Sequence, residues 1–507
     1  MMRRKQWIAT IWRRLLIALL LVGQLWLLFF LVARGTTFVT TCLQLVSVFV
    51  CLYMIGRPGK DGIKLSWVFL ILLVPVFGGI FYILLKATAP RHWLRDLNAR
   101  TGQNRAAYRL PGERLEEACG LAPECGPQLR YLEKCCGYPV YRNTQAEYLP
   151  SGEEKFRVLL RELKKAKRYI FLEYFIIEPG RMWSAILDVL KEKAAAGVDV
   201  RLIYDDLGCI LRLPGNYPRE LACYGIRCAC FNPFRPFLSS VQNNRDHRKL
   251  ACIDGEVAFT GGVNLADEYI NAAPRFGHWR DAAVVLRGDG AWGLTMLFLE
   301  MWSALLREPT DFSAFYPGPA ASFQDAPGMV QPYADSPLDD ENVGEHVYRQ
   351  IIENAKNYVY ISTPYLIPDE TLLSALAVAA KGGVDVRILT PKRWDKRLVH
   401  MTTRSYYPQL LAAGVRIYEY TPGFNHAKTF VADDAVGTVG TVNLDYRSLY
   451  LHFECGVWMY GTQAVGDMKE DFLRTLEKSE EIHLSDCRAG LPARLFREIL
   501  HVFAPLM

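Results

Sequence analysis

The chain contains little that would hold it together covalently or bind a structural metal. Its 13 cysteines are an odd number scattered over 507 residues, and no two CxxC motifs follow one another as they do in structural zinc sites. These patterns exclude a zinc-ribbon module and a small secreted disulfide scaffold, and they favour a reducing compartment. Cys252, which lies inside a motif described below, is expected to be an ordinary buried strand residue.

A strong excess of charge of either sign is also lacking. The 59 basic and 53 acidic residues leave a formal net charge of +6, which is small for a chain of this length. Because a protein that wraps nucleic acid has a larger basic excess, we predict no nucleic-acid partner and expect a membrane surface instead. The length allows two or three domains with sizeable cores.

Long apolar runs, in contrast, are abundant near the amino terminus. The segment 15–33 is apolar except for Gln24, and at about 1.5 Å per residue it nearly spans a bilayer core. Basic residues precede it, which favours a transmembrane helix with a cytoplasmic amino terminus. A cleaved signal peptide is the alternative, but no small-residue cleavage pattern follows cleanly.

Two further apolar runs, 37–55 and 65–85, are separated by a short polar turn and predict a helical hairpin. Pro75, Gly78 and Gly79 interrupt the second run, so it is either a transmembrane helix or a kinked or re-entrant segment. Three full crossings would place the rest of the chain outside the cell, whereas the basic residues on both flanks of the last run favour the inside. We therefore expect a multi-pass protein whose main globular region faces the cytoplasm, with either one element that does not cross fully or an amino terminus that lies outside.

The remainder of the chain contains one strand–helix–strand pattern twice. The β-branched and aromatic segment 169–175 corresponds to 358–361, and the helix end and strand at 193–203 correspond to 379–389. A repeat of this length indicates a duplicated domain rather than a solenoid. Consecutive βαβ units predict an α/β fold in which each copy has a mostly parallel sheet with helices on its faces.

Composition sets the limits of the predicted domains. Segments rich in Pro, Gly or mixed charge predict linkers before the first copy and between the two copies. The predicted order is a membrane region with two or three transmembrane helices at 1–89, a linker at 90–135, a first half at 136–311, an interdomain linker at 312–339 and a second half at 340–507.

Each half carries histidine, lysine and aspartate at the same spacing. Residues two apart on a strand share a face, so the histidine and lysine of each motif can project into one cleft. A lysine can bind the nonbridging oxygens of a phosphate, and an imidazole can attack phosphorus or transfer a proton near neutral pH. The candidate catalytic residues are His247, Lys249 and Asp254 in the first half and His426, Lys428 and Asp433 in the second.

An asparagine also recurs in register, since Asn264 and Asn443 each follow the histidine of their half by the same number of residues. A single His-x-Lys pair is weak evidence, because so short a pattern occurs by chance. Two copies inside a longer repeat indicate phosphodiester chemistry.

The paired motifs and their trailing asparagines resemble the phospholipase D superfamily, and the resemblance extends from Tyr141 to the carboxyl terminus. The apolar hairpin, the segment Trp279-Arg280-Asp281 and the segment from Asn443 to Ser448 are similar to bacterial cardiolipin synthases. This resemblance implies two duplicated phospholipase D-like domains that share one active site, preceded by transmembrane helices in a bacterial cell membrane. It also implies chemistry that needs no metal and no other cofactor.

The resemblance implies roles for the two histidines and for two acidic residues. His247 would attack the phosphodiester and His426 would act as general acid and base, although the near symmetry of the halves leaves the reverse assignment open. A nucleophilic histidine needs an acceptor on its second ring nitrogen. By analogy with the superfamily, Asp281 would orient His247 and Glu454 would orient His426.

The remaining motif residues would serve the phosphate or the backbone. Lys249, Lys428, Asn264 and Asn443 would bind the phosphoryl oxygens and stabilise the transition state. Asp254 and Asp433 belong to the motif, but we expect them to organise its turn rather than to act on substrate.

One position departs from the family pattern, because His452 stands where cardiolipin synthases usually have asparagine. Either an additional titrating group lies near the site, or the histidine is a simple polar replacement.

The expected function is cardiolipin synthesis, in which a phosphatidyl group passes from one phosphatidylglycerol to another with release of glycerol. The alternatives are a hydrolytic phospholipase D, a phosphatidyltransferase with another acceptor, a membrane-tethered nuclease and a noncatalytic membrane scaffold. The expected partners are phosphatidylglycerol and membrane lipids, with a homo-oligomer as a further possibility.

Overall fold

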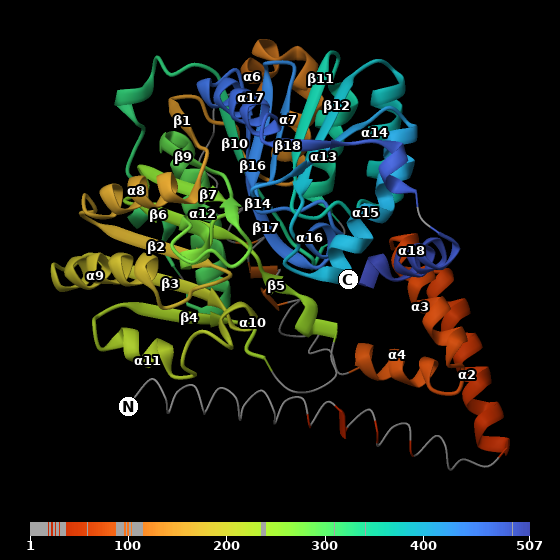
Figure 1. Ribbon diagram of the computed structural model, residues 1–507. Helices are drawn as coiled ribbons and strands as arrows, with labels where there is room; N and C mark the ends of the chain where they lie inside the picture. Colours follow the sequence, from red (N-terminus) through yellow and green to blue (C-terminus); the bar gives the residue numbers. More distant parts are fainter. Residues whose placement is uncertain are drawn as a thin grey trace.

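A computed structural model describes residues 37–57, 59–87, 115–234, 240–308, 310–339, 341–488 and 490–506, with a few positions between 19 and 103. Two β-sheets with flanking helices stand next to each other, and a helical hairpin lies below the second of them (Figure 1). The helix predicted over 15–33 falls almost wholly outside the described residues.

The first half is built on a seven-stranded sheet with the order β1-β9-β7-β6-β2-β3-β4. Only the βαβ strands β2, β3 and β4 run parallel, and the other neighbours are antiparallel. The strands are β1 (Thr144–Leu149), β2 (Tyr169–Tyr174), β3 (Asp199–Asp205), β4 (Arg227–Phe231), β6 (Lys249–Ile253), β7 (Val257–Gly261) and β9 (Ala283–Gly288). The prediction of a mostly parallel sheet was therefore wrong, because β6, β7, β9 and β1 all pair with antiparallel neighbours.

Helices cover both faces of this sheet because the side chains of β2 alternate between them. Phe171 points to the face covered by α12 and stacks on Phe298, with ring centroids 4.8 Å apart. Ile170 and Leu172 point to the opposite face and pack with residues of α8 and α9. The helices of this half are α8 (Gly152–Leu163), α9 (Arg181–Ala195), α10 (Asp206–Cys209), α11 (Tyr217–Ala222) and α12 (Asp289–Leu306).

The second half repeats this order as β10-β17-β16-β15-β11-β12-β13 and adds β18 at its edge, which confirms the duplication. Its strands are β10 (Met329–Asp335), β11 (Tyr358–Ser362), β12 (Asp385–Pro391), β13 (Arg416–Tyr420), β15 (Thr429–Ala432), β16 (Val436–Gly440), β17 (His452–Tyr460) and β18 (Ser479–Ile482). Its helices are α13 (Val343–Asn354), α14 (Glu370–Lys381), α15 (Arg397–Ala412), α16 (Tyr446–Tyr450), α17 (Gln463–Leu476) and α18 (Leu491–Phe503). One hydrophobic cluster runs through both halves and includes α12 residues together with β16 and β17 residues.

Parts of both predicted linkers are folded. Residues 115–135 of the linker predicted at 90–135 form α6 (Leu115–Leu121), a 3-10 turn (Pro123–Cys125), α7 (Gly126–Arg130) and a π-helical turn (Tyr131–Cys135). Leu129 and Leu132 are fully buried. The predicted linker at 312–339 contains β10, which pairs along its length with β17. These segments carry core residues, so composition alone misassigned them.

The membrane hairpin contains α2 (Thr37–Ile55), α3 (Asp61–Leu73) and α4 (Gly78–Ala87). Among the described residues, α2 is the one helix long and apolar enough to span a membrane. The next apolar run breaks at 74–77, because Pro75 cannot continue the backbone hydrogen bonding of a helix. The alternative of a kink in this apolar run is thus confirmed. Neither α3 nor α4 has the roughly 20 residues that a helix needs to cross a bilayer. The prediction of two or three transmembrane helices is supported for α2 alone.

The hairpin is fastened to the second half at its polar turn. Lys60 Nζ lies 2.5 Å from Glu345 Oε2 and 3.5 Å from Asp369 Oδ2. The hydroxyl of Tyr450 donates to both carboxylates, at 3.1 Å and 2.7 Å. Tyr450 ends α16, which leads directly into β17. The membrane region is therefore tied to the element that carries Glu454.

Candidate active site

Two short strands join the halves next to the motif histidines. The strand β5 (Arg245–Asp246) pairs with the start of β17, and the backbone N–H of His247 donates to Phe453 O at 2.9 Å. The strand β14 (Gly423–Asn425) pairs with β8 (His278–Arg280), and the N–H of His426 donates to Arg280 O at 2.7 Å. Each histidine therefore enters the site beside a strand of the other half.

This pairing gives each histidine a carboxylate from the opposite half. His247 Nδ1 lies 2.9 Å and 3.0 Å from the two oxygens of Glu454, and His426 Nδ1 lies 2.7 Å from Asp281 Oδ2. Our assignment of Asp281 to His247 and of Glu454 to His426 was wrong. It paired residues within each half, whereas the strands that hold the carboxylates cross between the halves.

The two carboxylates are held by different neighbours. Glu454 accepts hydrogen bonds from Thr441 Oγ1 at 2.5 Å and from Ser448 Oγ at 2.7 Å. Asp281 accepts from the N–H of Ala282 at 2.8 Å. Asp281 lies against Gly262, which corresponds to Thr441, and a Cβ at Gly262 would approach Asp281 Cγ to 2.8 Å. The shorter acid thus fits beside glycine and the longer acid bonds to threonine.

Both carboxylates are ionised. Burial opposes ionisation, but the interaction with His247, together with the charge of Lys249, holds the pKa of Glu454 below its usual value. His426 likewise outweighs burial and lowers the pKa of Asp281. An ionised acceptor at Nδ1 fixes the tautomer in which Nε2 of each ring carries the lone pair.

Burial disfavours the charged form of both histidines. Burial lowers the pKa of His247 well below its usual value, against the opposing charge of Glu454. Burial and the neighbouring Lys428 lower the pKa of His426 to about 4, against the charge of Asp281. A neutral imidazole with a free Nε2 is the form that can attack phosphorus.

The two lysines share the buried site with the histidines. Nζ of Lys249 donates to His247 O, and Nζ of Lys428 lies 2.9 Å from His426 Nδ1. Burial lowers the pKa of Lys249 to about 8 and that of Lys428 to about 7, against the nearby carboxylates. Lys249 also acts on His426 through its charge. The groups of both halves therefore lie in one electrostatic field.

The two asparagines differ in how free their amides are. Asn264 Oδ1 accepts from Ile176 N at 3.0 Å, and its Nδ2 donates to Tyr269 OH at 2.7 Å. The buried oxygen of Asn443 has no hydrogen-bond partner. The Asn264 amide has only one N–H left to offer, whereas the amide of Asn443 is less constrained.

Asp254 and Asp433 lie at the far end of the motif strands and hold backbone. Asp254 accepts from the N–H groups of Lys167, Arg168 and Tyr169, each at 2.8 Å. Asp433 accepts in the same way from residues 356–358, at 2.6–2.9 Å. Both adopt left-handed backbone, with φ of 54° and 53°. Neither is bonded to a histidine or lysine of the site, so the prediction that they are catalytic was wrong, and the geometry supports the expected role in the turn.

Replacing Asp433 with alanine is therefore expected to weaken folding and leave the chemistry intact. Loss of three hydrogen bonds to an ionised acceptor should lower the free energy of unfolding by about 2–4 kcal/mol. Thermal unfolding of the purified protein measures the loss, and kcat per folded molecule should stay within about threefold of the parent. Asp433→Asn, which keeps one acceptor oxygen, is the matched control with a smaller loss. A large fall in kcat without a fall in Tm would contradict this role.

His452 lies beside the first histidine. The centroids of the His247 and His452 rings are 5.5 Å apart, and His452 Nδ1 lies 3.7 Å from Glu454 Oε1. In the described part of the chain, these three residues form the one group whose ligand atoms lie close enough, within 4.8 Å, to hold a metal ion. Glu454 already accepts from His247, Thr441 and Ser448, which leaves this carboxylate less free to bind a metal ion. Among the residues that the structure describes, neither ring nitrogen of His452 has a hydrogen-bond partner.

Sequence reasoning missed the two hydroxyls that hold Glu454. Ser448 lies in the segment that resembles cardiolipin synthases, and its N–H also donates to Asp445, which caps α16. The Asx-type spacing of Asp445 and Ser448 is a recognisable helix start, but it does not reveal that the serine side chain reaches the carboxylate six residues later.

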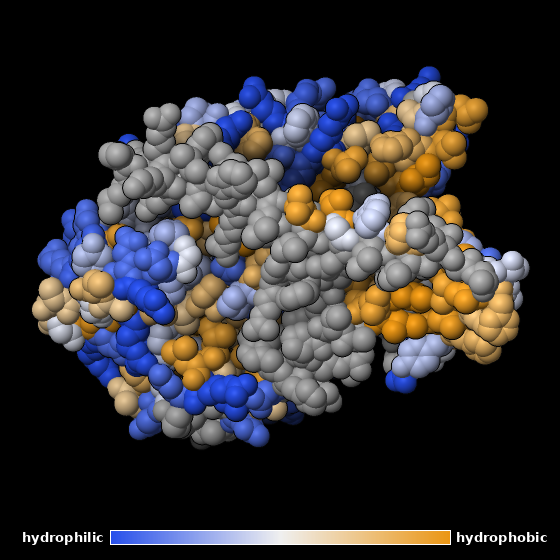
Figure 2. All heavy atoms as spheres, turned by 90° about the horizontal axis from the view of Figure 1, so that it is seen from below, coloured by the Kyte–Doolittle hydropathy of each residue, from blue (hydrophilic) through white to orange (hydrophobic). Residues whose placement is uncertain are grey.

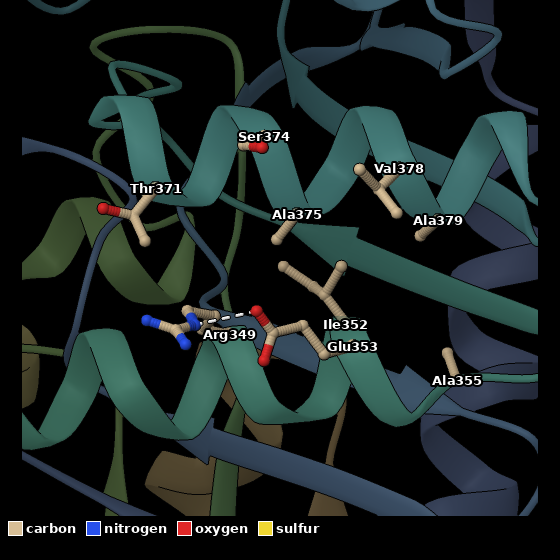
Figure 3. A pocket seen from close by; sticks show the side chains of 9 residues that line it. All are labelled: Arg349, Ile352, Glu353, Ala355, Thr371, Ser374, Ala375, Val378 and Ala379. Atoms are coloured by element: carbon tan, nitrogen blue, oxygen red, sulfur yellow. Dashed lines mark hydrogen bonds and ion pairs between the residues drawn. The ribbon is translucent and has the colours of Figure 1, made fainter.

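A separate surface pocket lies between α13 and α14 (Figure 3). Arg349 Nε and Glu353 Oε1 form an ion pair of 2.8 Å at its edge, and small or aliphatic side chains from the two helices line the rest. None of the motif residues reaches it, so it plays no part in the chemistry proposed below.

Duplicated sheets that bring two histidine–lysine pairs into one buried site define a protein of the phospholipase D superfamily. A family model described as "Cardiolipin synthase, PLD-like domain" matches residues 159–273 and 348–476. A second model, described as "Phospholipase_D-nuclease N-terminal", matches residues 42–86, which cover the hairpin.

Curated relatives extend over nearly the whole chain. A cardiolipin synthase of Alkalihalophilus pseudofirmus is 35% identical over 456 residues, which are 89% of this chain and 90% of the relative. A cardiolipin synthase of Geobacillus kaustophilus is 34% identical over 466 residues, 91% and 92% of the two chains. An uncharacterised protein of Streptococcus mutans is 43% identical over 463 residues, 90% and 99%. The chain belongs to the cardiolipin synthase family of phospholipase D-like proteins.

The fold also occurs among solved structures. A phosphatidylserine synthase of Haemophilus influenzae superposes with a TM-score of 0.54 at 14% identity, and the match covers 73% of this chain and 95% of that one. At this identity the match supports the shared fold alone.

Proposed function

We propose that the protein makes cardiolipin by transferring a phosphatidyl group from one phosphatidylglycerol to another. The observation that carries the proposal is the crossed arrangement in which His247 pairs with Glu454 and His426 with Asp281. Two independently oriented histidines suit a reaction in two steps, one that attacks phosphorus and one that moves protons. Phosphatidylglycerol is the substrate expected of a cardiolipin synthase.

In the first step Nε2 of His247 attacks phosphorus and the bond from phosphorus to the glycerol oxygen breaks. Nε2 of a protonated His426 gives its proton to the departing glycerol. The proton on Nδ1 of His247 stays on the ring and is donated in a hydrogen bond to Glu454, whose negative charge stabilises the substituted, positively charged ring. In the second step His426 takes the proton of a hydroxyl on another phosphatidylglycerol, the oxygen attacks phosphorus, and the bond to His247 breaks.

Binding of the substrate phosphate would favour protonation of His426, the proton donor of the first step. The charge of Lys428 contributes to the low pKa of His426, and a bound phosphodiester anion would neutralise that charge. The pKa of His426 should then rise in the complex, which favours the protonated form needed for the first step. Lys249, Lys428 and the Nδ2 amino group of Asn443 would hold the nonbridging oxygens.

The proposed arrangement in the membrane has the catalytic halves at the cytoplasmic face. The helix predicted over 15–33 would cross outward and α2 would cross back, so the polar turn with Arg57, Lys60 and Lys64 would lie inside, as the positive-inside rule favours. The short helices α3 and α4 would then stay on the same side. Proteolysis of the catalytic halves in sealed inverted vesicles, but not in intact spheroplasts, is the expected result.

The reaction is tested with the full-length protein in vesicles that contain phosphatidylglycerol labelled in its headgroup glycerol and in its acyl chains. Cardiolipin and free glycerol should appear in equal amounts, and added glycerol should reverse the reaction. Phosphatidic acid without cardiolipin would instead identify a hydrolytic phospholipase D. Failure to consume the lipid under all conditions would reject both functions.

The rate should depend on pH through the lysines. Because kcat/KM reports the free enzyme, it should fall as pH rises through about 7 to 8, where Lys428 and Lys249 lose their charge. A lowered lysine pKa means that the cation is present below this range and absent above it. Lys428→Arg keeps its charge at higher pH and should move the falling limb upward. A limb unmoved by this substitution would assign it to another group.

A further inference from the structure

The carboxyl-terminal helix α18 presents its hydrophobic residues to solvent. Leu491, Leu495 and Ile499 are 79%, 63% and 44% exposed, and they follow one another at a spacing of four, so they lie on one side of the helix. Leu484, in the turn before α18, is 54% exposed as well. A surface helix of a soluble domain normally buries such a stripe.

The opposite side of α18, which includes the buried Leu500, contacts the protein instead. Arg497 Nη1 donates to Cys487 O at 2.7 Å, and the ring of His501 stacks on Tyr406 of α15 with centroids 4.4 Å apart. These two contacts fix the rotation of the helix about its axis. The outward direction of the apolar stripe is thus built into the fold, and it requires another apolar medium to cover it.

The stripe adjoins the membrane hairpin. Ser66 Oγ of α3 donates to Val502 O at 2.5 Å, and the rings of Phe69 and Phe503 meet edge to face with centroids 5.7 Å apart. The outer side of α3 is apolar too, with Leu72 and Leu73 exposed. Figure 2 shows hydrophobic residues gathered on the side of the molecule where the hairpin and α18 lie.

We propose that α18 is an interfacial membrane helix that lies in the headgroup region of an anionic phospholipid bilayer, side by side with α3. The proposal rests on the membrane attachment through α2 described under the proposed function. Its occupant is the lipid surface because the stripe is continuous with a hairpin whose first helix can span a bilayer. Exposed Arg488 and Arg494 near the start of the helix supply positive charge for anionic lipid, as is usual for such helices.

This contact would hold the second half at a fixed height above the lipid. The hairpin is fastened through Lys60 to Glu345, Asp369 and Tyr450, and α18 adds a second attachment on the same half. Two attachments restrain rotation of the second half relative to the spanning helix α2. The site that contains Glu454, four residues after Tyr450, would then stay close to the surface from which both lipid substrates come.

The contact is tested by photocrosslinking of the full-length protein in nanodiscs that contain phosphatidylglycerol. The photoreactive residue p-benzoylphenylalanine replaces Leu495 in one variant and Val378 of α14, which is 68% exposed, in the control. Mass spectrometry of the labelled peptides should find about tenfold more phospholipid adduct at position 495, as expected for a helix buried in the headgroup region. Equal or absent lipid adducts at the two positions would overturn the proposal.

A second experiment measures how loss of this membrane contact changes the rate of cardiolipin synthesis. The triple variant L491E/L495E/I499E should make cardiolipin in phosphatidylglycerol vesicles at least about fivefold more slowly than V378E, because charged residues resist burial in the interface. An unchanged Tm excludes misfolding as the cause, and equal rates would count against the proposal. If no variant makes cardiolipin, the proposed function fails, while the crosslinking result still decides the place of α18.

Discussion

Replacing His426 with alanine is expected to block turnover of phosphatidylglycerol, whereas an activated lipid donor should still react and leave its phosphatidyl group bound to His247. Without a proton donor and acceptor, steady-state turnover should fall by about 10³-fold or more. An activated donor such as phosphatidyl-p-nitrophenol, whose leaving group needs no proton, should still give one equivalent of p-nitrophenol and a phosphatidyl adduct. Mass spectrometry of the quenched protein should locate that adduct on His247. His247→Ala should give neither burst nor adduct.

The control for this experiment is His452→Asn, since the rings of His247 and His452 lie 5.5 Å apart. This variant should still form the adduct on His247, which excludes His452 as the nucleophile. An adduct on His426 in the His247→Ala variant would reverse the two roles. Turnover retained in both alanine variants would overturn the catalytic assignment altogether.

Removing the charge of Glu454 or of Asp281 is expected to slow different steps of the reaction. Glu454→Gln places an amide against His247 Nδ1, disturbs the tautomer and withdraws the negative charge, so the burst of p-nitrophenol should slow by about 10²–10⁴-fold. Asp281→Asn acts on His426, so it should leave that burst within about threefold of the parent. Transfer of the bound phosphatidyl group to phosphatidylglycerol should slow instead.

These opposite effects distinguish the crossed pairing from pairing within each half. If Asp281 oriented His247, its substitution would suppress the burst and Glu454→Gln would not. Glu419→Gln is the matched control, because Glu419 is also a buried carboxylate but hydrogen-bonds to Tyr407. It should leave both steps unchanged in protein of equal stability.

The two halves repeat the same backbone contacts, but the side chains around their carboxylates differ. Asp254 and Asp433 hold equivalent turns with the same three backbone contacts. At the carboxylates, however, one half pairs aspartate with glycine and the other pairs glutamate with threonine. These local differences offer a physical basis for distinct roles of the two histidines.

Much of this molecule was predictable from local sequence. The β-branched and aromatic composition of 169–175 and the helix end and strand at 193–203 define the βαβ units, because these signals depend on neighbouring residues. The spacing of His247 and Lys249 places both side chains in the site for the same reason. Pro75 and its neighbouring glycines allowed a kink in the last apolar run, although they could not decide between a kink and a full crossing.

The tertiary structure decided which groups meet. His247 and Glu454 are 207 residues apart in the chain, and His426 and Asp281 are 145 apart, so no local pattern records either contact. Antiparallel return of the later strands, burial of 115–135 and the outward face of α18 likewise follow from packing between distant segments. The sequence by itself determined the duplicated fold and its phosphodiester chemistry, because these rest on periodicity and residue type. Only the tertiary structure showed that each histidine pairs with a carboxylate of the other half. This pairing follows from strands of the two halves that lie side by side, and their contact depends on the shape of both halves.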